Sequence, residues 1–148
     1  MTPFKSPDGM PIQSSAAQGV RGKVVLFPEY LEGIQDLEGF SHIYLLYYFH
    51  LIKRTKLVVK PFLDDKPRGV FATRSPQRPN HIGLSVVKLL KIDGNNLHIE
   101  NLDILNGTPL LDIKPYISLF DGLKETSAGW LENVDMNLGD IKSDNRFI

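Results

Sequence analysis

The sequence has 148 residues, no cysteine and a formal net charge of zero at pH 7. This length indicates one domain with a substantial core, and the lack of cysteine excludes disulfide scaffolds, thiolate zinc sites and cysteine nucleophiles. No apolar run reaches the ~18 residues of a membrane-spanning helix, and the first residues, MTPFKSPDGMPIQ, lack the layout of a secretory signal. We therefore expect a cytoplasmic protein that does not enter a membrane.

Residues 1–19 are rich in Pro, Ser, Gln and Gly and show no periodicity, which predicts an irregular start. Apolar runs bounded by turn residues predict β-strands over 22–27, 40–51, 57–59, 84–92, 97–105 and 110–117. Between the first two strands, the apolar positions of 28–39 recur every three or four residues and predict one amphipathic helix of about three turns. The tail after residue 121 has mixed polarity, and we expect it to pack loosely through Trp130 and Leu131.

Several short strands with turn signals and one helix predict a mainly β fold. We expect a single-domain β-barrel or closed sheet with one or two short helices and an irregular C-terminal tail. The domain would span 1–148, with a core at about 11–121 and a C-terminal extension at 122–148. No GxGxxG motif follows a predicted strand, so a Rossmann-type nucleotide fold has no support.

The charges are unevenly distributed along this neutral chain. Residues 53–91 hold ten basic side chains against two acidic ones, whereas residues 121–148 hold six acidic side chains against three basic ones. A basic centre suits a polyanionic partner, because phosphate neutralisation supplies most non-specific affinity for nucleic acids. A solvated face with compensating acids nearby explains the same pattern, and charge alone leaves both interpretations open.

The most unusual stretch covers residues 69–85, GVFATRSPQRPNHIGLS. It begins like a strand, with Val70 and Phe71, and continues as a loop that contains two arginines and two prolines. Proline fixes φ and removes a backbone donor, so this loop is rigid. A rigid loop that presents Arg74 and Arg78 predicts a site for an anionic or nucleotide-like ligand. The alternative is an Arg- and Pro-rich surface turn.

Few other polar residues point to a defined chemistry. No histidine has the spacing of a metal-binding motif, and no GxSxG elbow is present. His50 ends the aromatic strand, as part of a ligand site or as a core histidine. Asp103 lies in a mostly apolar strand and needs a partner, because an unpaired buried carboxylate is costly. That partner would be an arginine of the central loop or the hydroxyls of a bound ribose. Asp112 and Lys114 predict an ion pair across the sheet.

Three segments together resemble the TrmO family, also called TsaA-like or YaeB-like. They are LEGFSHIYLLYYFH, the central GVFATRSPQRPNHIGLS and the later NGTPLLDIKPY, and the resemblance extends over about 11–121. It implies a single-domain β-barrel that uses S-adenosylmethionine and forms a homodimer with the cofactor near the subunit interface. It also implies N6-methylation of the threonylcarbamoyl-adenosine beside the anticodon of certain tRNAs.

Carried over by position, the resemblance implies cofactor contacts from Pro11, Ile12, Gln13, His50, Leu51, Arg74, Leu84, Glu100, Asn101, Leu102 and Asp103. Asp103 would accept a hydrogen bond from the ribose or the methionine ammonium. Arg74 would pair with the methionine carboxylate or orient the acceptor. With Tyr44, these two are the candidate catalytic residues, and no metal is implied. The side chains that suit tRNA phosphates are Lys60, Arg68, Arg78 and Lys114.

The sequence departs from the usual family pattern in two places. An opening Ile-Gly-x-Ile strand is absent before Met1-Thr2-Pro3-Phe4, and His81 replaces a common proline, which restores a backbone donor to the loop. Two other functions stay open beside the methyltransferase. One is a non-catalytic RNA- or nucleotide-binding module on the same fold, and the other is methyl transfer to a different small acceptor.

Overall fold

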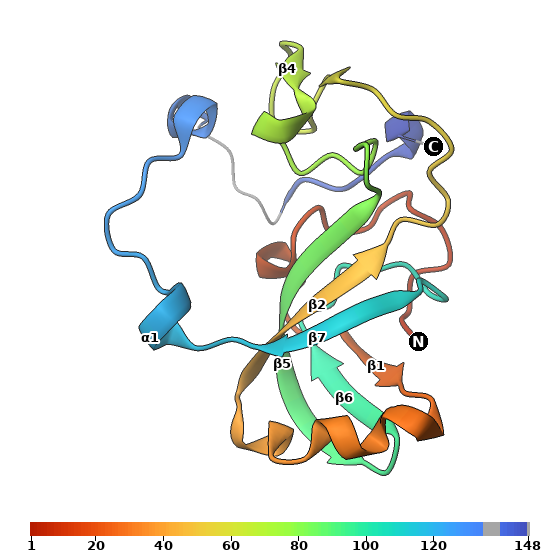
Figure 1. The fold of residues 1–148 in the computed structure, drawn as a ribbon. Helices are drawn as coiled ribbons and strands as arrows, with labels where there is room; N and C mark the ends of the chain where they lie inside the picture. The colour runs from red at the N-terminus through yellow and green to blue at the C-terminus, as the bar shows by residue number, and fades with distance from the viewer. Residues whose placement is uncertain (135–139, 148) are drawn as a thin grey trace.

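Five antiparallel strands form the main sheet of the computed structural model, which describes residues 1–134 and 140–147 (Figure 1). They are β1 (Arg21–Val25), β2 (His42–Tyr48), β5 (Ile82–Asp93), β6 (Asn96–Glu100) and β7 (Leu110–Pro115), in the order β1-β6-β5-β2-β7. A small second sheet pairs β3 (Val58–Val59) with β4 (Arg68–Gly69). Short helical segments are η1 (Ser14–Ala16), η2 (Pro28–Ile34), η3 (Leu37–Gly39), η4 (Val70–Ala72), α1 (Ser118–Asp121), η5 (Gly129–Asn133) and η7 (Asn145–Phe147).

The core lies against one face of the main sheet, because alternation along the strands sends every second side chain inward. In β2 these side chains are Ile43, Leu45 and Tyr47, and each of them is buried. Leu97 and Ile99 of β6 are almost completely buried, and both belong to the same core cluster as the inward side chains of β2. β5 pairs with β2 on one side and with β6 on the other, so the end of the central stretch, which begins β5, is fixed within the sheet.

The mainly β prediction is confirmed, although the term barrel is too strong for this sheet. In the described part of the chain, β1 and β7 occupy opposite edges and do not pair with each other. The outer edge of β1 instead meets the start of the chain, where the amide of Lys23 donates to the carbonyl of Met1 at 2.8 Å. The sheet is therefore strongly curved but open (Figure 1).

The predicted helix over 28–39 is wrong. Residues of this stretch form two short 3-10 segments, η2 and η3, separated by Asp36, which has a left-handed φ of 64°. A left-handed residue ends a right-handed helix, and Gly33 weakens the turn before it. The apolar positions still serve the core, because Ile34 and Leu37 pack against it.

Several predicted strands extend beyond the observed ones, and two of these differences have a clear backbone cause. The strand predicted over 97–105 ends at Glu100, because Asn101 has a positive φ of 67° that breaks the ladder. Val70 and Phe71, predicted to open a strand, instead form the 3-10 turn η4. Both differences arise from local backbone geometry that residue pattern alone does not reveal.

The tail packs more closely than predicted. Phe147 is buried with Val59 and Val70, and its ring meets that of Phe62 at 5.0 Å. The amide of Ser143 donates to the carbonyl of Met10, in the loop before η1, at 2.8 Å. Residues 140–147 therefore form part of the structure around the central stretch. No helix in the described ranges is long and apolar enough to cross a membrane.

Candidate functional site

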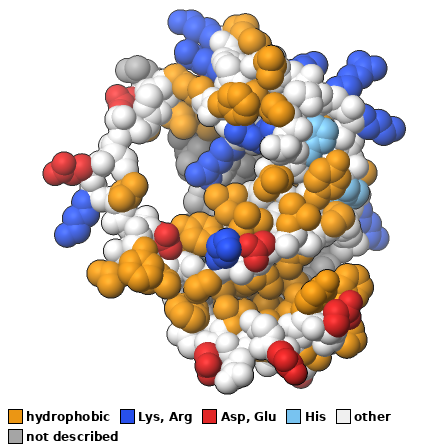
Figure 2. Space-filling model, in the orientation of Figure 1, with side chains coloured by type: hydrophobic (Ala, Val, Ile, Leu, Met, Phe, Trp, Pro, Cys, Tyr) orange, Lys and Arg blue, Asp and Glu red, His pale blue; other side chains and the backbone are white. Residues whose placement is uncertain are grey.

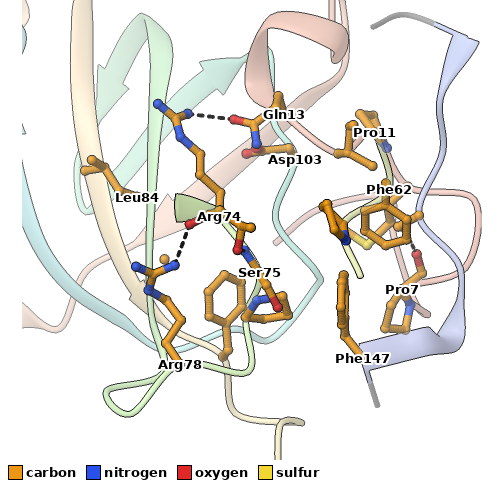
Figure 3. A pocket seen from close by; sticks show the side chains of 18 of the residues that line it. Pro7, Pro11, Gln13, Phe62, Arg74, Ser75, Arg78, Leu84, Asp103 and Phe147 are labelled. Atoms are coloured by element: carbon orange, nitrogen blue, oxygen red, sulfur yellow. Dashed lines mark hydrogen bonds between the residues drawn. The ribbon is translucent and has the colours of Figure 1, made fainter. Parts of the chain in front are cut away.

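A cavity of about 990 Å³ opens between the carboxyl end of β2, the start of β5, the central stretch and the tail. Its walls come from the stretches 10–13, 49–52, 71–76, 82–84 and 103–105, with tail residues 130, 131, 143, 144 and 147. Gln13, Arg74 and Asp103 group on one side, while Phe62 and Phe147 form an aromatic wall on another (Figure 3). This size and mixture suit a small organic ligand with a few polar anchors.

A chain of hydrogen bonds connects three side chains at the base of the cavity. The hydroxyl of Ser85 donates to Oδ1 of Asp103 at 2.6 Å, and the hydroxyl of Tyr47 lies 3.0 Å from the same serine oxygen. Ser85 and Tyr47 are buried, with 3% and 6% of their surfaces exposed. Because Ser85 donates to the carboxylate, Tyr47 is the donor to Ser85. These two hydrogen bonds therefore hold Asp103 in one orientation.

Burial raises the pKa of Asp103 from its ordinary 3.8 to about 6. The hydrogen bond from Ser85, nearby backbone amides and the charge of Arg74 oppose this effect without cancelling it. Burial also raises the pKa of Tyr47, and the charge of Asp103 adds to that rise. At neutral pH the site therefore contains the carboxylate of Asp103, whose proton affinity is above normal, and the neutral phenol of Tyr47.

Arg74 provides the cationic group of the site. Its Nη1 donates to Oε1 of Gln13 at 2.7 Å, which connects the central stretch to the early loop (Figure 3). The guanidinium is solvent-accessible and close enough to Asp103 to lower the pKa of that carboxyl. The arrangement leaves most of the five donors of Arg74 available to an anionic ligand.

Arg78 serves the loop itself. Its Nη1 donates to the carbonyls of Val70 at 3.1 Å and Thr73 at 2.7 Å. These bonds fasten the end of η4, so a large part of the arginine is occupied inside the protein. Its predicted role toward phosphates stays a prediction, with fewer free donors than the sequence suggests.

The structure brings most of the predicted cofactor residues together. The residues that line the cavity are Pro11, Ile12, Gln13, His50, Leu51, Arg74, Leu84 and Asp103. His50 is exposed at this position, so it is not a core histidine. These residues come from four segments that are distant in the sequence, and the cavity is where they meet.

Four predicted residues lie elsewhere. Glu100 forms an ion pair with Arg21 at 3.0 Å, and Asn101 accepts a hydrogen bond from the amide of Gly19. Leu102 is buried in the core. Tyr44 lies on the opposite face of β2 from Tyr47. Direct roles for these residues at the cavity are therefore not supported by its geometry.

Tyr44, the predicted catalytic tyrosine of the aromatic strand, does not line the cavity, whereas Tyr47 does. The ring of Tyr44 packs against Tyr116 at 5.6 Å, away from the cavity, whereas Tyr47 reaches Asp103 through Ser85. Side chains in a strand change face at each residue, so Tyr47 shares the inward face of Leu45. That alternation could have identified Tyr47, but no local pattern pointed to Ser85.

Three of the four basic residues predicted to contact tRNA phosphates form ion pairs with acids. Arg68 pairs with Asp64 at 2.6 Å, and Lys60 pairs with Asp65 at 2.8 Å. Lys114 pairs with Asp112 at 2.9 Å, which confirms an ion pair, although it lies along β7 and does not cross between strands. The exposed pairs of Lys60 and Lys114 are weak and can exchange for phosphate oxygens.

Two further features of the described residues are the position of His81 and the lack of a metal-binding cluster. His81 stacks near Tyr48 at 6.1 Å, and its Nε2 is buried without a hydrogen-bond partner among the described residues. This does not connect it to the cavity. In the same described ranges, no group of three or more His, Cys, Asp or Glu side chains is placed to hold a metal ion.

Comparison with known proteins agrees with this fold. A family model described as the tRNA-methyltransferase O N-terminal domain matches residues 1–122. A probable S-adenosyl-L-methionine-binding protein of Pyrococcus abyssi is 51% identical over 146 residues, which are 99% of this chain and 79% of that relative. The human tRNA (adenine(37)-N6)-methyltransferase is 39% identical over 127 residues, which are 80% of this chain and 28% of that protein.

The crystal structure of TrmO from Pseudomonas aeruginosa matches with a TM-score of 0.73 and 35% identity, covering 87% of this chain and 57% of that one. The chain thus spans little more than half of this solved protein and about a quarter of the human relative. The resemblance drawn from the three sequence segments is confirmed, because the family model covers most of the chain. The chain belongs to the TrmO family, through its tRNA-methyltransferase O N-terminal domain.

Proposed function

We propose that this protein binds S-adenosylmethionine in the cavity and methylates N6 of the threonylcarbamoyl-adenosine beside the anticodon of tRNA. The observation that carries the proposal is the joining of Asp103, Arg74 and Gln13 inside one largely apolar cavity, in a member of this family. The names of the Pyrococcus and human relatives support the cofactor and the tRNA substrate. A cytoplasmic location is part of the same proposal, because tRNA is the substrate.

The residues at the cavity fit the chemical groups of this cofactor. Asp103 offers a carboxylate to an ammonium or a ribose hydroxyl, and Arg74 offers donors to a carboxylate. Apolar walls such as Leu51 and Leu84 suit an adenine ring. When bound, the cofactor supplies an electrophilic methyl group on a sulfonium centre. Pairing charged groups within a partly buried site favours this ligand over a neutral one of the same size.

The protein contributes positioning and control of protons. Methyl transfer is an in-line displacement, whose rate depends on alignment and on exclusion of water. The Tyr47–Ser85–Asp103 chain fixes a carboxylate whose pKa of about 6 lets it accept a proton near neutral pH. Arg74 pairs with the cofactor carboxylate or orients the acceptor, and the Arg74–Gln13 bond holds it at the cavity in either case.

Methyl transfer to tRNA tests this function. We expect radiolabelled methyl groups from S-adenosylmethionine to enter tRNA that carries the threonylcarbamoyl group, and not tRNA that lacks it. Calorimetry with the cofactor alone provides the control for binding. Absence of cofactor binding at sub-millimolar concentration would exclude enzymatic function. Binding without transfer would favour a non-catalytic module, and transfer to both tRNAs would indicate a different acceptor.

We infer that the protein forms a homodimer through the segment after β7. Leu119, Phe120 and Leu123 are 85%, 71% and 77% exposed, and the segment with α1 stands away from the sheet (Figure 1). A group of exposed apolar side chains supports burial against a second copy. The same segment continues to Trp130, which lines the cavity, so a dimer contact here would lie near the site.

Sedimentation measures this assembly directly. The wild-type protein is expected to sediment as a dimer, and the double variant Leu119→Glu/Phe120→Glu as a monomer, because charge at the contact prevents burial. Tyr30→Glu provides a matched control, since Tyr30 is also exposed but lies in η2. A wild-type monomer at micromolar concentration would contradict the inference.

A further inference from the structure

Phe71 is an exposed aromatic residue at the edge of the cavity. It lines the cavity and yet has 75% of its surface exposed, while its neighbour Val70 is 1% exposed. An exposed phenylalanine gives up most of the hydrophobic stabilisation that its burial would provide. The fold therefore keeps this ring in solvent beside the opening of the proposed site, on a backbone that is itself anchored in the core.

The turn that carries Phe71 is held at both ends. The amide of Val70 donates to the carbonyl of Leu57 at 2.9 Å, and the amide of Thr73 donates to the carbonyl of Val70 at 3.1 Å. Arg78 adds its two bonds to the carbonyls of Val70 and Thr73. The position of the ring is thus set before any ligand arrives, which reduces the entropy lost on binding.

Each of two aromatic rings beside η4 has a guanidinium next to it. Cζ of Arg78 lies 5.8 Å from the centre of the Phe71 ring, and Cζ of Arg68 lies 5.3 Å from that of Trp130. Trp130 is tied to the same turn, because its Nε1 donates to the carbonyl of Ala72 at 2.8 Å. An exposed aromatic ring with arginines nearby, such as Phe71, is a surface on which single-stranded nucleic acids stack.

The charge around this turn favours a nucleic acid over a protein or a lipid surface. Lys and Arg side chains surround the end of the molecule that carries β4, while Asp and Glu lie mostly elsewhere on the visible face (Figure 2). In the described part of the chain, Lys53, Arg54 and Lys56 form no side-chain ion pair, so their charges are available to phosphates. Loops and single strands, whose bases are unstacked, are the RNA elements that aromatic side chains recognise.

We propose that Phe71 is a stacking platform for an unpaired base of the RNA substrate, next to the base that enters the cavity. This inference rests on the proposed function and deepens it. The ring binds one base face, Arg78 keeps the ring in place, and the basic side chains of residues 53, 54 and 56 bind the flanking phosphates. Stacking on a phenyl ring does not read base identity, so Phe71 contributes affinity and positioning without sequence selectivity.

Anisotropy with a fluorescein-labelled single-stranded RNA of the anticodon-loop sequence tests this role. Phe71→Ala is expected to weaken RNA binding at least about fivefold, and Phe71→Leu to weaken it equally, because leucine keeps apolar volume but has no π face. Phe71→Trp is expected to bind as the wild type does. The matched control is Phe27→Ala, since Phe27 is 70% exposed and precedes η2 at the opposite end of the molecule from β4 (Figure 1).

An RNA with an abasic nucleotide at the stacked position identifies the contact. With this RNA, wild type and Phe71→Ala are expected to bind equally. Equal affinity of wild type and Phe71→Ala for the intact RNA would overturn the proposal. The proposal would also fail if Phe71→Ala lost cofactor affinity by the same factor as RNA affinity, or if this variant sedimented differently from the wild type. If tRNA methylation by the wild type persists in that case, only the stacking role fails. If the wild type binds neither RNA nor cofactor, the proposed function fails with it.

Discussion

Replacing Asp103 with alanine is expected to weaken binding of S-adenosylmethionine at least about tenfold, the effect of losing one hydrogen bond to a charged group. The carboxylate lies at the base of the cavity and is fixed by Ser85 at 2.6 Å. Water replaces its contact poorly, because the position is partly buried. Calorimetric titration of both proteins at neutral pH measures the difference.

Two variants separate this contact from general effects of charge. Asp112→Ala removes a carboxylate that lies on β7, pairs with Lys114 and does not line the cavity, so its cofactor affinity is expected to be that of the wild type. Asp103→Asn keeps the shape and loses the charge, and it is expected to bind weakly at every pH. Unchanged affinity in Asp103→Ala would contradict the assignment.

The raised pKa of Asp103 gives this contact a pH dependence. With a pKa of about 6, the carboxyl is mostly ionised at pH 7 and mostly protonated at pH 5. Only the ionised form accepts hydrogen bonds with both oxygens and attracts an ammonium, so affinity decreases as pH falls. The free-protein pKa implies a loss of about tenfold between pH 7 and pH 5. Asp103→Asn is expected to show no such dependence over this range.

Gly83→Ala is expected to lower the free energy of unfolding by about 1–3 kcal/mol or more, because it overpacks the site. A Cβ at this position would lie 2.5 Å from Cζ of Tyr47 and 2.8 Å from Cζ of Phe49. Tyr47 has little room to retreat, since it is buried and its ring meets that of Phe49 at 5.3 Å. Urea unfolding of both proteins measures the change.

The same substitution is expected to weaken cofactor binding, because displacement of Tyr47 breaks its bond to Ser85 and releases Asp103. Gly33→Ala is the matched control, as nothing lies within 4 Å of its added Cβ. Wild-type stability in Gly83→Ala would mean that the rings move aside at no cost. Wild-type cofactor affinity in a folded Gly83→Ala protein would mean that the Tyr47–Ser85–Asp103 hydrogen bonds do not position Asp103.

The order of the strands along the chain followed from the sequence because its causes are local. Alternating apolar residues and turn residues such as Gly94 specify where a strand begins and ends, without reference to its neighbours. The exceptions have local causes that composition conceals. Asp36 and Asn101 both have positive φ values, which end a predicted helix and a predicted strand.

Part of the candidate site was also predictable. Asp103 is conspicuous as an acid in a mostly apolar stretch, and Arg74 as a cation in a rigid loop. The resemblance to the TrmO family adds the early loop, where Gln13 contacts Arg74. The sequence did not show which face of β2 contributes a tyrosine to the cavity, where Tyr47 lies and Tyr44 does not.

By itself, then, the sequence determined the mainly β fold, the family and the importance of Arg74 and Asp103. Only the tertiary structure decided that Ser85 connects Tyr47 to Asp103, and that Trp130 and Phe147 of the tail line the same cavity. The physical reason is distance along the chain. These contacts join residues far apart in sequence, and they depend on packing that no local pattern encodes.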